Sequence, residues 1–330
     1  MEDGLQNKIE SIQVLRFFAA FSVMLVHIPM FGFGNWGVDI FFVISGFIMM
    51  YITEKENRFF LYKRIIRIVP LYWILTLGVF IIAAIKPDYL NNTTADIEHL
   101  IKSLFFIPFN KNGAGHYPIL FLGWTLNFEI IFYLLFGMCL FISRKYRFVL
   151  CSISLIVFYF YCSFKSSENF IYLSYANTML FEFIFGMIAF VIWNKFKKIK
   201  INLLINSLFL ILFFIIVTIF LNSNLPSFLK HGIPAFLLII YFLFSINNFK
   251  FPKILISLGD ASYCIYLLHP YIIQFFYKLF EINNYNIFIQ LINVILISLI
   301  VFLVSIFIFK FLEHPINKKL KKNLISYEKI

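Results

Sequence analysis

An arginine and a histidine, Arg16 and His27, interrupt the first apolar stretch of the chain, SIQVLRFFAAFSVMLVHIPM. At about 100° per residue their spacing closes three helical turns, so both side chains project from one face, roughly 16 Å apart along the axis. A neutral imidazole is a general base, and a guanidinium stabilises developing negative charge. The alternatives are a histidine bonded to a neighbouring backbone group and an arginine reaching back to the membrane surface. Their shared face favours a polar track through an apolar bundle.

Two carboxylates also lie in apolar stretches, where ionisable groups are costly and therefore candidates for function. Glu129, in GWTLNFEIIFYLLFG, is the more deeply placed, with Asn127 two residues before it. Asp39, in GVDIFFVISGFIMMYIT, lies near the start of the second stretch. Either acid could hold the tautomer of His27, as in a catalytic triad. For Asp39 the alternative is a carboxylate favoured at a helix start by the helix dipole.

A basic segment, KRIIRIVPLYWIL, precedes the third apolar stretch and contains Lys63, Arg64 and Arg67. Arg64 and Arg67 are neighbours on one helical face. Guanidinium groups bind phosphate in a bidentate manner, so the segment predicts a phosphate site, with anchoring to anionic lipid as the alternative. Pro70 and Tyr72 follow, and the proline predicts a kink or break in the helix.

Three further ionisable residues lie in apolar stretches: Glu182, His269 and Glu313. Each could either act in a site or form hydrogen bonds between helices. The sequence has no G-x-S-x-G, no H-E-x-x-H, no Walker A loop and no C-x-x-C among its 4 cysteines. Serine-elbow hydrolysis, ATP hydrolysis and a metal site are therefore not predicted.

The elements that must carry these residues are membrane helices. Of 330 residues, 62% are hydrophobic and 13% are charged, against about 45–50% and about 25% in soluble domains. This composition excludes a disordered chain and a disulfide scaffold, and argues strongly against a soluble enzyme. Apolar stretches long enough to cross a bilayer occur at about 12–30, 36–53, 68–86, 119–142, 147–164, 170–193, 201–221, 232–246, 260–280 and 287–312. We therefore predict an all-α polytopic transmembrane bundle of about ten spans.

Basic residues fix the expected orientation. With the N-terminus inside, the segments assigned to the cytoplasm hold 20 lysines and arginines and the outside loops hold 5. This asymmetry follows the positive-inside rule and predicts that both termini are cytoplasmic. The net charge of +12 is thus a topology signal, and no nucleic-acid partner is expected. The tail after Glu313 is short, so we expect one membrane domain over residues 1–330 without a C-terminal soluble domain.

The segments quoted above resemble the acyltransferase-3 family of integral membrane O-acyltransferases. The resemblance is carried in order, from the first stretch to the last, by IQVLRFFAAFSVMLVH, GVDIFFVISGFIMM, KRIIRIVPLYWIL, GWTLNFEIIFY, LGDASYCIYLLHP and FLEHP. The opening, the GVDIFFVISGF block and the RIVPLYW block look most like the branch that acetylates bacterial exopolysaccharides and related surface glycans, such as O-antigen.

The resemblance implies an acyl donor, usually acetyl-CoA, a carbohydrate hydroxyl as acceptor, and a place among the lipids of the bacterial inner membrane. The family's Arg-x10-His pair falls on Arg16 and His27, its basic block on Arg64 and Arg67, and its acidic residue on Glu129. We accordingly expect catalytic roles for His27, Glu129, Asp39 and Arg16, and donor binding by Arg64, Arg67, Lys63 and Tyr72. The competing hypotheses are a transporter or flippase for glycan intermediates, which would use intramembrane charges without acyl transfer, and a non-catalytic scaffold.

Overall fold

Helices make up most of the computed structural model. The structure describes residues 9–29, 31, 34–54, 58–90, 93–110, 117–199, 203–221, 223–246, 249–280 and 286–327, and no strand occurs in these ranges. In the first half of the chain the helices are α1 (Glu10–Val26), α2 (Trp36–Ile52), α3 (Phe60–Ile85), η1 (Pro87–Tyr89), α4 (Ile97–Leu104), η2 (Phe121–Gly123), α5 (Trp124–Ile142) and α6 (Arg147–Lys165). In the second half they are α7 (Phe170–Tyr175), α8 (Leu180–Phe196), α9 (Leu203–Leu221), α10 (Ser227–Lys230), α11 (Gly232–Phe244), α12 (Lys253–Asp260), α13 (Ser262–Phe280), α14 (Ile287–Ile308), η3 (Phe309–Glu313) and α15 (His314–Tyr327).

The apolar helices confirm the all-α class. Each of the ten expected stretches contains a helix. Among the described residues, six helical segments are long and apolar enough to cross a membrane, and two shorter apolar helices accompany them. The six are Phe60–Ile85, Phe121–Ile142, Arg147–Lys165, Phe170–Phe196, Ser227–Phe244 and Ile287–Lys322. The protein is therefore a multi-pass membrane protein, while the count of ten crossings and the cytoplasmic termini stay predictions.

Two helix boundaries differ from those expected. α3 begins at Phe60, well before residue 68, because the basic segment is itself helical, and the helix continues through Pro70 without a break. The stretch 170–193 is divided into α7 and α8. Asn169 caps the start of α7 through the Ile171 amide, 2.9 Å away, and Asn177 accepts a hydrogen bond from Met179 just before α8. Asparagine favours such caps, which explains the interruption.

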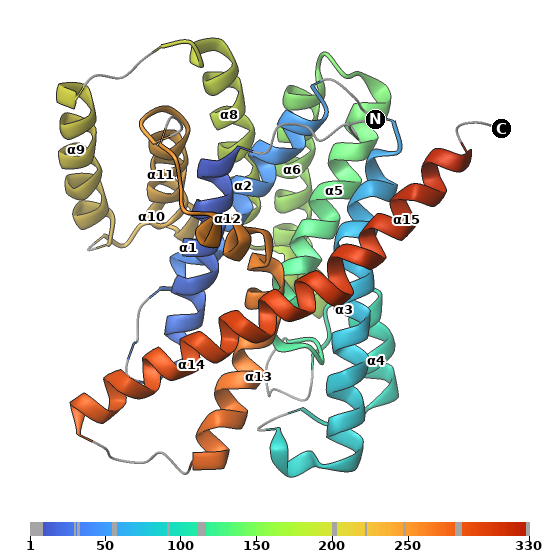
Figure 1. Cartoon of the computed structure of the whole chain (residues 1–330). Helices are drawn as coiled ribbons and strands as arrows, with labels where there is room; N and C mark the ends of the chain where they lie inside the picture. Colours follow the sequence, from blue (N-terminus) through green and yellow to red (C-terminus); the bar gives the residue numbers. More distant parts are fainter. Residues whose placement is uncertain are drawn as a thin grey trace.

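α1 and α2 lie in the middle of the molecule, with α8 and α11 on one side and α3 and α5 on the other (Figure 1). α2 and α8 approach each other most closely at Gly46 and Gly186. A Cβ atom added to Gly46 would lie 2.1 Å from the Phe183 carbonyl oxygen, and one added to Gly186 would lie 2.0 Å from that of Val43. Small residues permit such close helix packing in membranes.

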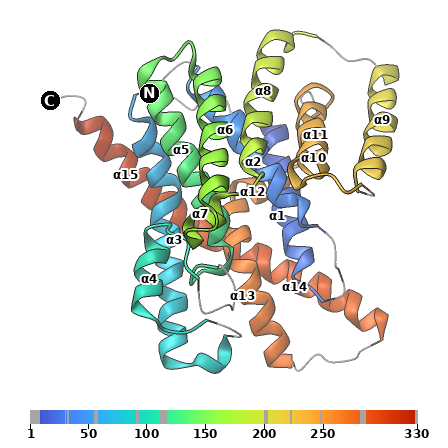
Figure 2. The same cartoon turned by 180° about the vertical axis from the view of Figure 1, so that it is seen from behind.

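The last helices form one continuous rod from α14 through the π-helical turn η3 into α15, and this rod crosses the face of the bundle shown in Figure 1 and lies behind it in Figure 2. π-helical turns are rare and are often found at functional sites. The turn η3 brings Glu313 into the bundle, where it is buried.

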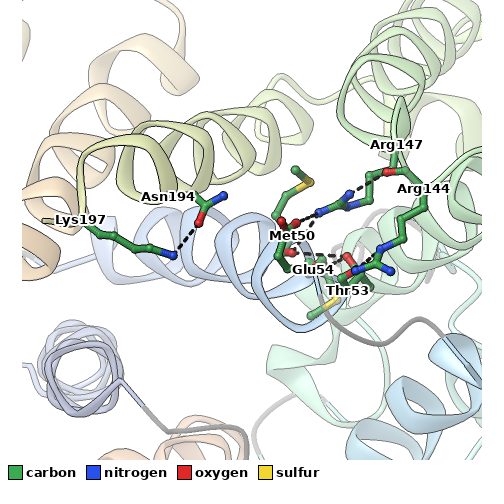
Figure 3. A network of polar contacts seen from close by, with 8 residues as sticks. Met50, Thr53, Glu54, Arg144, Arg147, Asn194 and Lys197 are labelled. Atoms are coloured by element: carbon green, nitrogen blue, oxygen red, sulfur yellow. Dashed lines mark hydrogen bonds and ion pairs between the residues drawn. The ribbon is translucent and has the colours of Figure 1, made fainter.

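Two arginines at the α5–α6 turn close the C-terminal end of α2 (Figure 3). Arg144 donates to the Thr53 carbonyl oxygen at 3.1 Å. Arg147 pairs with Glu54 at 2.6 Å and reaches the Met50 carbonyl oxygen at 3.5 Å. The last carbonyls of a helix lack partners within the helix, so these cations satisfy them and fix α6 against α2.

Candidate functional site

Three arginines from two helices meet around a cavity of about 100 Å³. We call it the arginine cavity. Its lining comes from α1, α2, α3, α5 and α13: Arg16, Val38, Phe41, Phe42, Ile44, Ser45, Ile48, Met49, Arg64, Arg67, Ile68, Thr125, Leu126, Glu129, Tyr133, Tyr263 and Tyr266. Four residues that the sequence singled out, Arg16, Arg64, Arg67 and Glu129, are thus brought together.

Glu129 is the negative group of the arginine cavity. One of its carboxylate oxygens accepts hydrogen bonds from the Ser45 hydroxyl, at 2.5 Å, and from the Tyr133 hydroxyl. Its charge attracts the guanidinium groups of Arg16 and Arg64. The carboxylate is therefore held on the arginine side, oriented by two hydroxyl groups.

Arg67 has its own counter-ion. Its guanidinium forms an ion pair with Glu313 of η3, and the Cys264 thiol donates to the other carboxylate oxygen of Glu313 at 3.0 Å. The buried Nε atoms of Arg16 and Arg64, by contrast, have no hydrogen-bond partner in the described part of the chain. Native structures leave few such donors unpaired, so these two groups are suited to an anionic ligand.

His27 faces a different cavity, of about 470 Å³. We call it the histidine cavity. It is lined by His27, Pro29, Thr93, Phe121, Pro270, Tyr271, Ile273, Gln274, Tyr277 and Lys278. Arg16, in α1, and His27, at the C-cap of α1, therefore line two different cavities rather than one polar track.

The hydrogen bonds of His27 define its tautomer. Its Nδ1 lies 2.9 Å from the Val23 carbonyl oxygen, which can only accept, so Nδ1 carries the proton. His269 makes the same contact with the Ile265 carbonyl oxygen at 2.9 Å, and its Nε2 lies 3.2 Å from His27 Nδ1. His269 Nε2 is then the bare nitrogen and accepts from His27. The remaining nitrogen of neutral His27, Nε2, is without a proton and is able to accept one.

Tyr266 stands between the two cavities. It lines the arginine cavity, its hydroxyl lies 2.9 Å from that of Thr125, and its ring centre lies 6.3 Å from that of His269. Its ring also packs edge-on against that of Phe41, which lines the same cavity, at 5.5 Å between ring centres. The rings of Tyr266 and His269 thus connect the lining of the arginine cavity to His27, whose ring centre lies 4.9 Å from that of His269.

Three predicted site residues lie elsewhere. Asp39 is buried at the start of α2, where its carboxyl group faces that of Glu182 in α8. No hydrogen bond between described residues joins Asp39 to His27, because α2 turns this residue toward α8 while His27 faces α13. Tyr72 donates to the Ser103 carbonyl oxygen at 3.0 Å and packs α3 against α4. Lys63 is not among the described residues that line the arginine cavity.

Sequence reasoning missed the hydroxyl groups around Glu129 and the pairing of His269 with His27. The spacing of Glu129 and Tyr133, one helical turn apart, was a usable signal. Ser45 comes from another helix, and spacing alone does not show which helices are neighbours.

Comparisons with known proteins identify the family of the chain. A family model described as an acyltransferase domain, that of acyltransferase family 3, matches residues 9–310. The exopolysaccharide production protein ExoZ of Rhizobium meliloti (strain 1021) is 37% identical over 169 residues, which cover 50% of this chain and 53% of ExoZ. The match thus spans about half the length of that relative. No solved structure matches the chain. Because the family model covers most of its length, the chain belongs to the acyltransferase 3 family.

Proposed function

We propose that this protein is a membrane O-acyltransferase that moves an acetyl group from acetyl-CoA to a hydroxyl group of a bacterial surface glycan. The observation that carries the proposal is that one helix, α1, contributes Arg16 to a cation-rich cavity and His27, a proton-accepting histidine, to a second cavity. The aromatic side chains of Tyr266 and His269 lie between Arg16 and His27. ExoZ, by its name a protein of exopolysaccharide production, supports a glycan acceptor.

The arginine cavity suits the donor. Arg16, Arg64 and Arg67 supply three positive charges against Glu129 in the cavity wall and Glu313 behind Arg67. Phosphate groups of CoA would bind at the guanidinium groups. A cavity of about 100 Å³ is far smaller than the several hundred Å³ typical of sites for whole ligands. It fits a slender pantetheine arm, with the nucleotide outside.

The acyl transfer follows from the tautomer of His27. Its unprotonated Nε2 accepts the proton of the acceptor hydroxyl while the hydroxyl oxygen attacks the thioester carbonyl carbon. The carbon–sulfur bond then breaks, and the proton on Nε2 passes to the leaving thiolate of CoA. The Val23 carbonyl oxygen and His269 Nε2 hold the Nδ1 proton throughout, 2.9 and 3.2 Å from Nδ1.

The test is mass spectrometry of the purified surface glycan from cells with the gene, without it, and with His27→Ala. We expect the mass of one acetyl group per acetylated repeat to disappear in the deletion strain and in His27→Ala. His314→Ala, at an exposed histidine of α15, is the matched control and should keep the acetyl group. Normal acetylation by His27→Ala would refute the role of His27. An unchanged mass with an altered amount of glycan in the deletion strain would instead indicate a transporter.

A further inference from the structure

A third pocket, of about 220 Å³, lies on the opposite side of α5 from the arginine cavity. We call it the aromatic pocket and define it by six of its lining residues: Tyr117, Trp124, Asn127, Phe128, Tyr175 and Asn177. α5, α7 and the segment that leads into α5 lie together in Figure 2. The acyl-transfer chemistry above uses none of these residues.

The α5 residues that line the arginine cavity and those that line the aromatic pocket lie on different faces of the helix. At about 100° per residue, Thr125 and Glu129 fall within about 40° of each other, and both line the arginine cavity. Asn127 is turned about 160–200° away from them. Phe128, which lines the aromatic pocket with Asn127, packs edge-on against Tyr175 at 5.7 Å between ring centres. One helix therefore serves the donor cavity and the aromatic pocket on opposite faces.

Asn127 is an unusual residue for this position. It is 4% exposed, and its side-chain oxygen has no hydrogen-bond partner in the described part of the chain. Burying an amide without a partner costs free energy, and a leucine of similar size would avoid that cost. Such a group in a pocket wall indicates a ligand that completes its hydrogen bonds.

The remaining lining specifies the class of ligand. The Asn177 side-chain oxygen accepts from the Met179 amide at 3.0 Å, which leaves its amide nitrogen as a donor to the pocket. Tyr117, Trp124, Phe128 and Tyr175 supply aromatic surface, and no charged side chain belongs to the described lining. Apolar ring faces combined with a few fixed amide groups suit a neutral sugar ring, which has both C–H faces and hydroxyl edges.

The aromatic pocket adjoins the histidine cavity. Phe121 lines the histidine cavity with its ring centre 5.8 Å from that of His27, and on its other side it contacts the Tyr117 ring at 4.5 Å. The Tyr117 ring thus lies within the sum of these two distances from His27. One or two linked sugar rings cover that span.

We propose that the aromatic pocket is a second sugar subsite, which binds a neutral sugar next to the one that carries the reacting hydroxyl. The inference rests on the proposed glycan acceptor. In this arrangement Asn127 and Asn177 bind hydroxyl groups of the neighbouring sugar, and Trp124 and Tyr117 cover its ring. The pocket then sets which hydroxyl of the repeating unit reaches His27.

The test measures the KM of the purified protein for two acceptors of different length. These are the acetyl-accepting monosaccharide and the complete repeating unit, both prepared from glycan of the deletion strain. Asn127→Leu should raise the KM for the repeating unit about threefold to tenfold, the effect of one hydrogen bond. The KM for the monosaccharide and the KM for acetyl-CoA should stay unchanged, since neither reaches the pocket. Asn206→Leu is the matched control, because its buried side-chain oxygen also lacks a partner but it lies on α9.

Equal KM values of wild type and Asn127→Leu for the repeating unit would overturn the subsite. So would an equal rise for the monosaccharide, which would indicate a general disturbance of the site. Direct binding of the repeating unit, followed by protein fluorescence, separates this inference from the proposed function. Binding that Asn127→Leu weakens, without any acetyl transfer by wild type, would support the subsite and refute the acyltransferase reaction. No binding to wild type would overturn the subsite.

Discussion

Replacing His269 with leucine should slow acyl transfer without unfolding the protein. In the wild type, His27 Nδ1 has two acceptors, the Val23 carbonyl oxygen at 2.9 Å and His269 Nε2 at 3.2 Å. Leucine is apolar and removes the second acceptor. The side chain of His269 is fully buried, and its other contact is to a carbonyl oxygen one turn back on its own helix, so helix packing is largely kept.

The size of the effect follows from the charge on His27 during transfer. When Nε2 takes the hydroxyl proton, the ring becomes an imidazolium and its Nδ1 hydrogen bonds become charge-assisted. A hydrogen bond to a charged group contributes about 1.5–3 kcal/mol. Its loss in the transition state alone therefore lowers kcat about 10- to 100-fold. The KM for acetyl-CoA should change little, because His269 is not among the described residues that line the arginine cavity.

The assay is acetyl-CoA-dependent acetylation of the isolated glycan, followed by thiol release across a range of pH. His269→Gln should recover part of the rate, since its amide oxygen can accept from His27 Nδ1, and its pH profile should lie nearer the wild type than that of His269→Leu. Wild-type kcat in His269→Leu would refute the positioning role. Equal losses in the glutamine and leucine variants, with an unshifted pH profile, would reduce His269 to a packing residue.

Two further predictions test the donor cavity and the helix packing. Arg64→Ala should raise the KM for acetyl-CoA about 10-fold or more through loss of a charge-assisted phosphate contact. Lys63→Ala, at the adjacent residue, should change this KM little. Equal effects of the two variants would indicate that both residues anchor the protein to lipid. Gly186→Ala should lower stability by about 1–3 kcal/mol, measured as the melting temperature in detergent, because the added Cβ would lie 2.0 Å from the Val43 carbonyl oxygen. Gly78→Ala should not lower the melting temperature, because its Cβ would meet nothing within 4 Å. Similar losses of stability in the two variants would argue against close α2–α8 packing.

The helices were predictable from the sequence because apolar length is a local property. Each expected stretch contains a helix, yet the start of α3 and the division between α7 and α8 were missed. Both errors come from polar residues. The basic turn of α3 is charged, so the apolar pattern places the start of the span after it, and apolar length alone does not detect the asparagines Asn169 and Asn177 at the break.

The site was predictable only in part, because its contacts join different helices. Helical spacing correctly grouped Arg64 with Arg67. It could not show that Asp39 faces Glu182, or that His269 is the partner of His27, since these contacts depend on the rotation of one helix against another. Interrupted apolar stretches thus identified candidate residues, and packing decided which of them share a cavity.

The spacing on α1 gives the proposed reaction its geometry. Eleven residues at 1.5 Å each separate Arg16 from His27 by roughly 16 Å, about half the thickness of the hydrocarbon core. An extended pantetheine arm anchored by phosphates at the arginines covers such a length, so the thioester can meet His27 while both residues stay fixed on one rigid helix. Tyr266, which lines the arginine cavity and contacts His269, then lies where the pantetheine arm must pass. An acceptor held at His27 would then meet the thioester only after the arm has passed Tyr266, which keeps water and unbound hydroxyl groups away from the thioester until an acceptor is in place.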